Sequence, residues 1–122
     1  MKKGDIERFK QRLLAIRKEH LKEKEILEAE YLHKQVREKT SNLSAYPIHI
    51  ADISGDVYEQ EKEISIIENI SNTIQEIDSA MLRIEDGTYG ICEGCKKGIA
   101  IERLEIIPFT RLCIKCQKEK GA

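Results

Sequence analysis

Four cysteines lie near the carboxyl end of the 122-residue sequence, in two pairs with the same internal spacing. Cys92 and Cys95 form one C-x2-C pair, Cys113 and Cys116 form the other, and 17 residues separate the pairs. Zn2+ takes four ligands tetrahedrally, and two residues between paired cysteines let both sulfurs of a turn reach one ion. The quartet therefore predicts one structural Zn2+, because four cysteines leave no open position for catalysis.

A redox dithiol is the competing interpretation of a C-x2-C pair. A thioredoxin-like motif would come with alternating strand and helix patterns, and the sequence shows none. No apolar run approaches the length of a membrane span, and the basic start leads into a charged helical pattern instead of a signal core. We expect a cytoplasmic protein without a membrane partner, in which paired cysteines hold metal more readily than they form disulfides.

Two amphipathic patterns precede the cysteines and predict two long helices. The first runs from Asp5 to about Thr40 without Pro or Gly, and the second runs from about Asp56, a candidate N-cap, to Asp86 before Gly87. The connector between them is short, so the helices should pair along apolar seams. The residues expected in the seams include Leu32 and Val36 on the first helix and Val57, Ile64, Ile67, Ile70, Ile74 and Ile77 on the second.

The predicted fold class is mostly α. It combines a long antiparallel coiled-coil hairpin over residues 1–87, with its tip at about 43–55, and a small four-cysteine zinc-finger module with a short C-terminal helix over residues 88–122. A hairpin formed within one chain favours a monomer.

Charge and composition exclude several classes of function. The net charge is −1, and residues 43–87 carry two basic against ten acidic side chains, so strong direct DNA binding is not expected. The sequence has no paired nucleophile and base and no phosphate-binding loop, which argues against an enzyme.

The cysteine region resembles the zinc finger of the DksA/TraR family. The resemblance rests on G-x-C-x-x-C, Arg103-Leu104-Glu105, Pro108 and Leu112-Cys113-x-x-Cys116. The stretch EDGTYGICE at 85–93 is similar to the YteA branch of Gram-positive bacteria, which is linked by name to sporulation. The resemblance implies a transcription regulator that binds bacterial RNA polymerase and inserts its coiled-coil tip into the secondary channel to modulate initiation.

The resemblance also assigns residues at the tip. The family carries Asp-x-x-Asp-x-Ala there, and alignment from the first zinc cysteine places these positions on His49, Asp52 and Ser54. Only Asp52 keeps a carboxylate, which would act near the catalytic Mg2+ of the polymerase or on the mobile elements around it. His49 removes a negative charge at neutral pH, so activity of the better-known kind is in doubt.

A second departure from the family concerns the alarmone ppGpp. Three positions implied to contact it through basic side chains hold Glu76, Ile107 and Gln117, none of which pairs with a phosphate as Lys or Arg would. We expect weak or absent ppGpp dependence. Arg103 has two interpretations, a polymerase contact or a structural ion pair with Glu105 or the coil.

The alternative function is a coiled-coil zinc-finger adaptor or DNA-binding protein without polymerase-channel activity. Basic residues in the finger region, including Lys96, Lys97 and Arg111, would form its nucleic-acid surface. A gel shift that disappears with added salt would favour this alternative.

Overall fold

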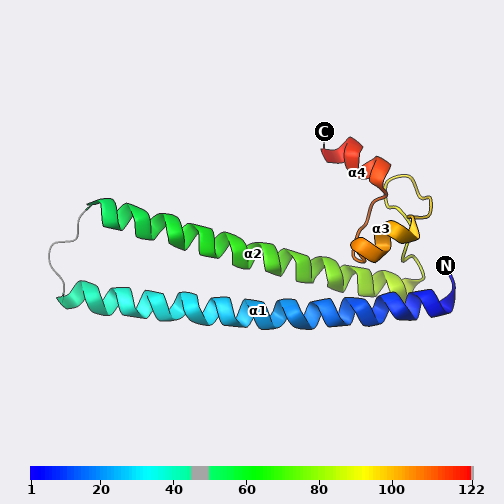
Figure 1. Ribbon diagram of the computed structural model, residues 1–122. Helices are drawn as coiled ribbons and strands as arrows, with labels where there is room; N and C mark the ends of the chain where they lie inside the picture. The colour runs from blue at the N-terminus through cyan, green and yellow to red at the C-terminus, as the bar shows by residue number, and fades with distance from the viewer. Residues whose placement is uncertain (45–49, 122) are drawn as a thin grey trace. The chain divides into compact units, whose positions relative to one another are not determined.

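The computed structural model describes the backbone of residues 1–44 and 50–121 and the side chains of residues 1–37 and 58–121. Within these residues it contains four helices and no strands, apart from an isolated bridge between Ile91 and Gly98 (Figure 1). The helices are α1 (Lys3–Ser44), α2 (Ile50–Asp86), α3 (Ile101–Ile106) and α4 (Ile114–Gly121). The predicted fold class, two long packed helices followed by a four-cysteine module with a short final helix, is confirmed.

Both long helices extend beyond their predicted limits. α1 continues to Ser44, and α2 begins at Ile50, six residues before the predicted N-cap Asp56. Gly55, which directly precedes the predicted N-cap, therefore lies inside α2, and a helix tolerates it because one glycine costs only about 1 kcal/mol relative to alanine.

Contacts divide the chain into two compact units. The first contains Met1–Glu19 and Thr73–Ala122, and the second contains His20–Asn72. The predicted boundary between residues 87 and 88 stays a prediction. None of the helices in the described part of the chain is both long and apolar enough to cross a membrane.

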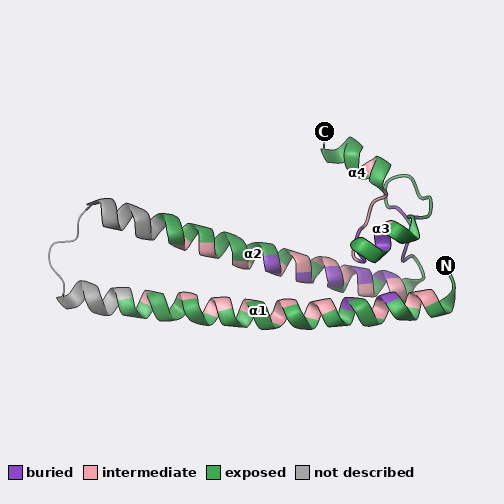
Figure 2. Ribbon diagram, in the orientation of Figure 1, coloured by how far each residue is buried: buried purple, intermediate pink, exposed green. Residues whose placement is uncertain are grey.

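The first unit holds the core, which joins the start of α1 and the end of α2 to the cysteine-bearing loops. Figure 2 shows buried residues gathered on these parts of both helices. An ion pair from Arg17 to Asp78, with 2.7 Å between Nε and Oδ1, crosses between the helices on the surface. The buried cluster draws on α1, α2, the loop that follows α2, and α3: Phe9, Leu13, Ile77, Ala80, Tyr89, Cys92, Ile99 and Leu104.

The second unit contains the part of α1 from His20 onward and the part of α2 up to Asn72, and its seam is more polar. Lys34 on α1 forms an ion pair with Glu63 on α2, as expected for antiparallel helices. Half-buried residues recur at seam spacing along both helices, together with the buried Ile70, and many are polar: His20, Lys24, Leu27, Tyr31 and Gln35 on α1, and Gln60, Glu63, Ile67 and Ile70 on α2. Leu21, Glu28 and Ser71 beside them are also half-buried.

The seam prediction is wrong for Leu32, Val36 and Ile64, which are all exposed. On α2 the regular alternation of three-residue and four-residue steps leads back from Ile70 to Ile67 and then to Glu63. Ile64 would require two successive steps of three, which rotates it away from the partner helix. The side chain of Val57 lies outside the described residues.

Candidate metal centre and the finger around it

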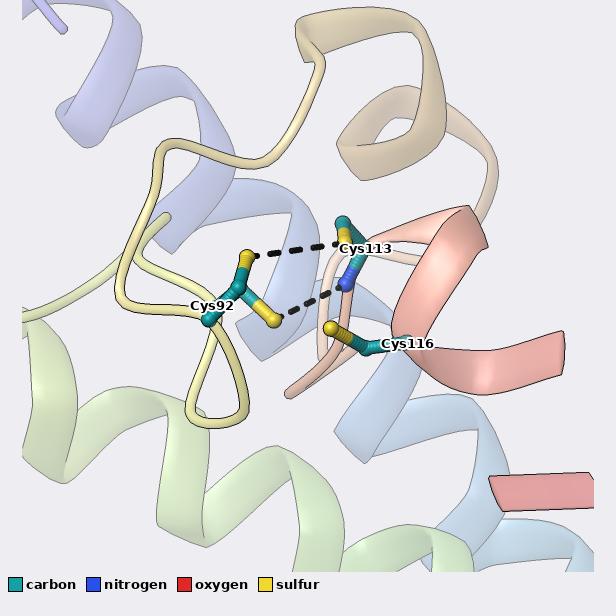
Figure 3. Close-up of side chains that lie close together, drawn as sticks. Cys92, Cys113 and Cys116 are labelled. Atoms are coloured by element: carbon teal, nitrogen blue, oxygen red, sulfur yellow. Dashed lines mark hydrogen bonds between the residues drawn. The ribbon is translucent and has the colours of Figure 1, made fainter. Parts of the chain in front are cut away.

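The four cysteines converge in the first unit. Their Sγ atoms all lie within 4.8 Å of one another. Figure 3 shows Cys92 on the loop that follows α2, Cys113 directly before α4 and Cys116 on α4, with the sulfurs gathered between these segments. The spacing suits four thiolates around one ion, so the donor set fits the Zn2+ that the sequence predicts.

Backbone geometry explains how the first cysteine pair is formed. The Cys92 N–H donates to the Lys97 carbonyl at 2.8 Å, and the Lys96 N–H donates to the Cys92 carbonyl at 2.9 Å, which closes a tight turn. Lys96 takes a φ of 64°, a left-handed conformation that costs a residue with a side chain about 1 to 2 kcal/mol. The turn is therefore held in a geometry that glycine would adopt more easily.

Gly94 allows the two cysteine pairs to approach each other. A Cβ atom at this position would lie 3.1 Å from Cys116 Sγ and 3.4 Å from Cys116 Cβ. Gly94 does not take a positive φ, so close approach, and not backbone conformation, is the reason for glycine here.

Hydrogen bonds to the sulfurs favour a thiolate at one cysteine and oppose it at another. Backbone N–H groups of Cys95 and Cys113 lower the pKa of Cys92 to about 6, and the Cys113 nitrogen lies 3.4 Å from its Sγ. Hydrogen bonds with the Cys92 and Cys113 sulfurs raise the pKa of Cys116 to about 12. Four thiolates this close repel one another, and a divalent cation removes that repulsion.

Arg83 joins the finger to α2 from a buried position. The side chain is 9% exposed and donates to Ser79 Oγ at 3.0 Å, to the Phe109 carbonyl at 3.3 Å and to the Thr110 carbonyl at 3.4 Å. Burial and the nearby Arg111 lower the pKa of Arg83. A buried guanidinium of this kind must be fully hydrogen-bonded, so it fixes the loop that follows α3 against the helix.

Tyr89 and Arg111 hold the same loop at two further points. The buried Tyr89 hydroxyl donates to the Pro108 carbonyl at 2.8 Å. Arg111 forms an ion pair with Glu76 at 2.6 Å and another with Glu93 at 3.4 Å, and it donates to Ser79 Oγ at 2.9 Å. The loop therefore reaches the cysteine knuckle in a defined position.

Sequence reasoning did not identify these arginines as structural. It grouped Arg111 with a basic surface patch, whereas the structure pairs it with two carboxylates. A signal was present on α2, where Glu76, Ser79 and Arg83 recur at steps of three and four beside the apolar seam. Such a polar stripe indicates a helix face that receives another polar segment.

Arg103 has a structural contact, though not the predicted one. Its Nε donates to the Leu112 carbonyl at 2.9 Å, directly before Cys113. Glu105 instead accepts from Arg8 of α1 at 3.4 Å. The interpretation of Arg103 as an ion-pair partner of Glu105 is therefore wrong, and its role as a polymerase contact stays a prediction.

The three positions considered for ppGpp come together in the structure. Glu76, Ile107 and Gln117 line one open pocket of about 660 Å3, together with Arg103, Arg111 and Lys120. Arg111 is engaged by Glu76 and Glu93, and the Arg103 Nε is engaged by a carbonyl, so these two cations are already in part satisfied within the chain. Lys120 adds one further ammonium, but the Glu76 and Glu93 carboxylates in the same lining oppose a polyanionic nucleotide.

The predicted tip residues lie outside the described side chains. Asp52 and Ser54 fall within the bounds of α2, and His49 precedes it. Their roles stay predictions.

Fold and site together define a class of protein, a helical hairpin that carries a zinc finger of the C4 type. The model of the prokaryotic dksA/traR C4-type zinc finger matches residues 87–120. The RNA polymerase-binding transcription factor DksA of Caulobacter vibrioides is 30% identical over 121 residues, which cover 97% of this chain and 77% of that protein. The chain therefore belongs to the DksA/TraR family and carries one structural zinc.

Two further similarities concern the branch of the family and the fold of the chain. The uncharacterized protein YteA of Bacillus subtilis is 42% identical over 66 residues, which cover 54% of this chain and 28% of that protein. The structure of the transcription factor DksA2 from Pseudomonas aeruginosa has a TM-score of 0.79 at 22% identity, covering 99% of this chain and 86% of that one. The first supports the predicted YteA similarity, and the second supports the fold.

Removal of zinc should unfold the finger and loosen the first unit, because Cys92 is part of the buried core. We expect one zinc per chain by metal analysis and lower zinc content for Cys95→Ser. After chelation, hydrogen exchange measured by mass spectrometry should accelerate most in residues 87–121 and around Phe9 and Leu13. Residues 24–37 of the second unit serve as the internal control. Unchanged protection of 87–121 after full zinc loss would contradict the structural role.

Lys96→Gly should strengthen zinc binding, because glycine relieves the left-handed conformation at this position. The net gain should be about 0.5 to 1 kcal/mol, which corresponds to a roughly twofold to fivefold higher zinc affinity. Competition with a chromophoric chelator measures it. Lys97→Gly is the matched control and should weaken binding, because Lys97 does not take a positive φ. Equal effects of the two substitutions would show that strain at Lys96 is not the cause.

Proposed function

We propose that this protein binds bacterial RNA polymerase and regulates transcription initiation, with the hairpin tip inside the secondary channel. The observation that carries the proposal is the match over 97% of the chain to a relative named as an RNA polymerase-binding transcription factor. The proposal is supported by a helical hairpin, which is thin enough to enter a channel, and by a finger fixed to its base. Binding to polymerase would place the protein in the cytoplasm.

In this proposal the finger and the tip have separate tasks. Zinc, held by Cys92, Cys95, Cys113 and Cys116, has no chemical role and stabilises the finger as a docking module. Arg83 and Arg111 hold the finger to α2, so docking of the finger would also orient that helix. The Asp52 carboxylate would act at the tip near the polymerase Mg2+, and the chain itself would catalyse no reaction.

Dependence on ppGpp is not part of the proposed function. The pocket that includes Glu76, Ile107 and Gln117 has an acidic, an apolar and a neutral side chain at the positions where the family resemblance implies contacts to phosphate. Phosphate is recognised best by several cationic donors together, and here Arg111 is already paired with two carboxylates, which leaves Lys120 and part of Arg103. The nucleotide should therefore add little to the effect of the protein.

Asp52→Asn should abolish the effect on initiation while polymerase binding remains, because the substitution removes the tip carboxylate but leaves the finger unchanged. Transcription in vitro and biolayer interferometry with purified polymerase measure the two properties. Asp56→Asn is the matched control, and it should behave like the wild type. Failure of the wild type to bind polymerase would refute the proposed function, and a salt-sensitive gel shift in that case would favour the DNA-binding alternative.

Addition of ppGpp should change the transcriptional effect of the wild type by less than about twofold, because Glu76 and Glu93 line the pocket and two of its three cations, Arg103 and Arg111, are engaged within the chain. Glu76→Lys with Gln117→Lys should introduce a response to the nucleotide. Gln75→Lys is the control for the added positive charge, because Gln75 is an exposed residue beside Glu76 on α2. A strong synergistic effect of ppGpp with the wild type would contradict this expectation.

A further inference from the structure

The second unit places some apolar side chains on its surface, while several residues of its seam are polar. Leu32 is 63% exposed and Ile64 is 38% exposed. Glu63 and Gln60, by contrast, are half-buried between the helices. Pairing of α1 with α2 does not require Leu32 and Ile64 to be apolar, so their chemistry calls for an explanation outside the hairpin.

Helical geometry places Leu32 and Ile64 on the same side of the hairpin. Each follows an inward-facing residue by one position, Tyr31 on α1 and Glu63 on α2. One step along a helix turns the side chain by about 100°, and in an antiparallel pair this turn leads to the same side from both helices. The Lys34–Glu63 ion pair sets the register that brings Leu32 and Ile64 opposite each other.

Acidic residues surround this apolar pair. Glu25, Glu61 and Glu68 each follow an inward residue by one position, so they share the side of Leu32 and Ile64. All three are exposed, and no ion pair of theirs occurs among the described residues, whereas the half-buried Glu28, which follows Leu27 on the same side, pairs with Lys24 at 3.8 Å. We call this side, with Leu32, Ile64, Glu25, Glu61 and Glu68, the acidic-rimmed face.

The other side of the same unit differs in its electrostatics. Lys34 lies there among Glu63, Glu59 and Glu30, and these carboxylates raise the pKa of Lys34. The negative charge on that side is therefore in part compensated within the chain. On the acidic-rimmed face only Glu28 has an ion pair among the described residues, with Lys24, so the charges of Glu25, Glu61 and Glu68 remain open to an external partner.

We infer that the acidic-rimmed face is a docking surface for an apolar protein surface bordered by Lys and Arg. Charge complementarity selects this occupant, because the face is negatively charged. It would repel nucleic acid, an anionic membrane and the same face of a second copy, which are negatively charged as well. The inference rests on the proposed function, in which this partner surface belongs to RNA polymerase. The face would then fix the rotation of the hairpin relative to the polymerase, and the finger would supply separate contacts.

Two pairs of substitutions test the apolar part. Leu32→Ser with Ile64→Ser removes the apolar centre of the face. Ile26→Ser with Ile66→Ser is the matched control, because both isoleucines are exposed and each precedes an inward residue by one position, which places them on the other side. Biolayer interferometry with polymerase should show about tenfold weaker binding for the first pair and a change below about twofold for the control. Thermal unfolding checks that both variants fold like the wild type.

Charge reversal tests the acidic rim. Glu61→Lys with Glu68→Lys should weaken polymerase binding by about tenfold at low salt and by less at high salt, because the lost attraction is screened. Glu30→Lys with Glu59→Lys, on the other side, should have a smaller effect.

The outcomes separate this inference from the function on which it rests. If the wild type binds polymerase, and each pair of substitutions on the face loses as much affinity as its control pair on the other side, the docking face is refuted. The proposed function is then unaffected. No binding by the wild type refutes both. A wild-type dimer in light scattering that Leu32→Ser with Ile64→Ser dissociates would overturn the inference in favour of self-association.

Discussion

Four sulfurs within 4.8 Å of one another set the main constraint on this chain. They cannot all carry negative charge in that space unless a cation lies between them, so the tertiary structure of the finger depends on metal chemistry. The chain meets this constraint with a left-handed turn at Lys96 and with a glycine at position 94 that leaves room for Cys116. Because Cys92 also belongs to the hydrophobic core, the metal and the packed helices stabilise the same unit.

The loop between α3 and α4 shows how a small module without a large core is held. Its carbonyl groups at Pro108, Phe109 and Thr110 receive hydrogen bonds from Tyr89 and the buried Arg83. Arg111 adds ion pairs on the surface, where each contributes little by itself. Many polar contacts thus determine the position of the loop, and the metal adds stability to the module that they position.

Much of this structure could be predicted from sequence, because its signals are local. Helical periodicity predicted two long helices, and cysteine spacing predicted the metal-binding quartet. The prediction was wrong for Ile64, since an isoleucine near a seam resembles a seam residue until the register of the opposite helix is known. The contacts of Arg83 and Arg111 depend on segments distant in sequence, and composition alone carries no information on such pairings.

Burial differs among the four cysteines: Cys92 is buried, Cys113 and Cys116 are half-buried, and Cys95 is exposed. Metal exchange should therefore be ordered. A competing ligand meets Cys95 first, and Cys92 is the last sulfur to lose the ion, because its release also opens the core. The lifetime of the bound metal is then governed by the rate at which the core opens, so packing at Phe9 and Leu13 controls a rate constant at a site that these residues do not coordinate.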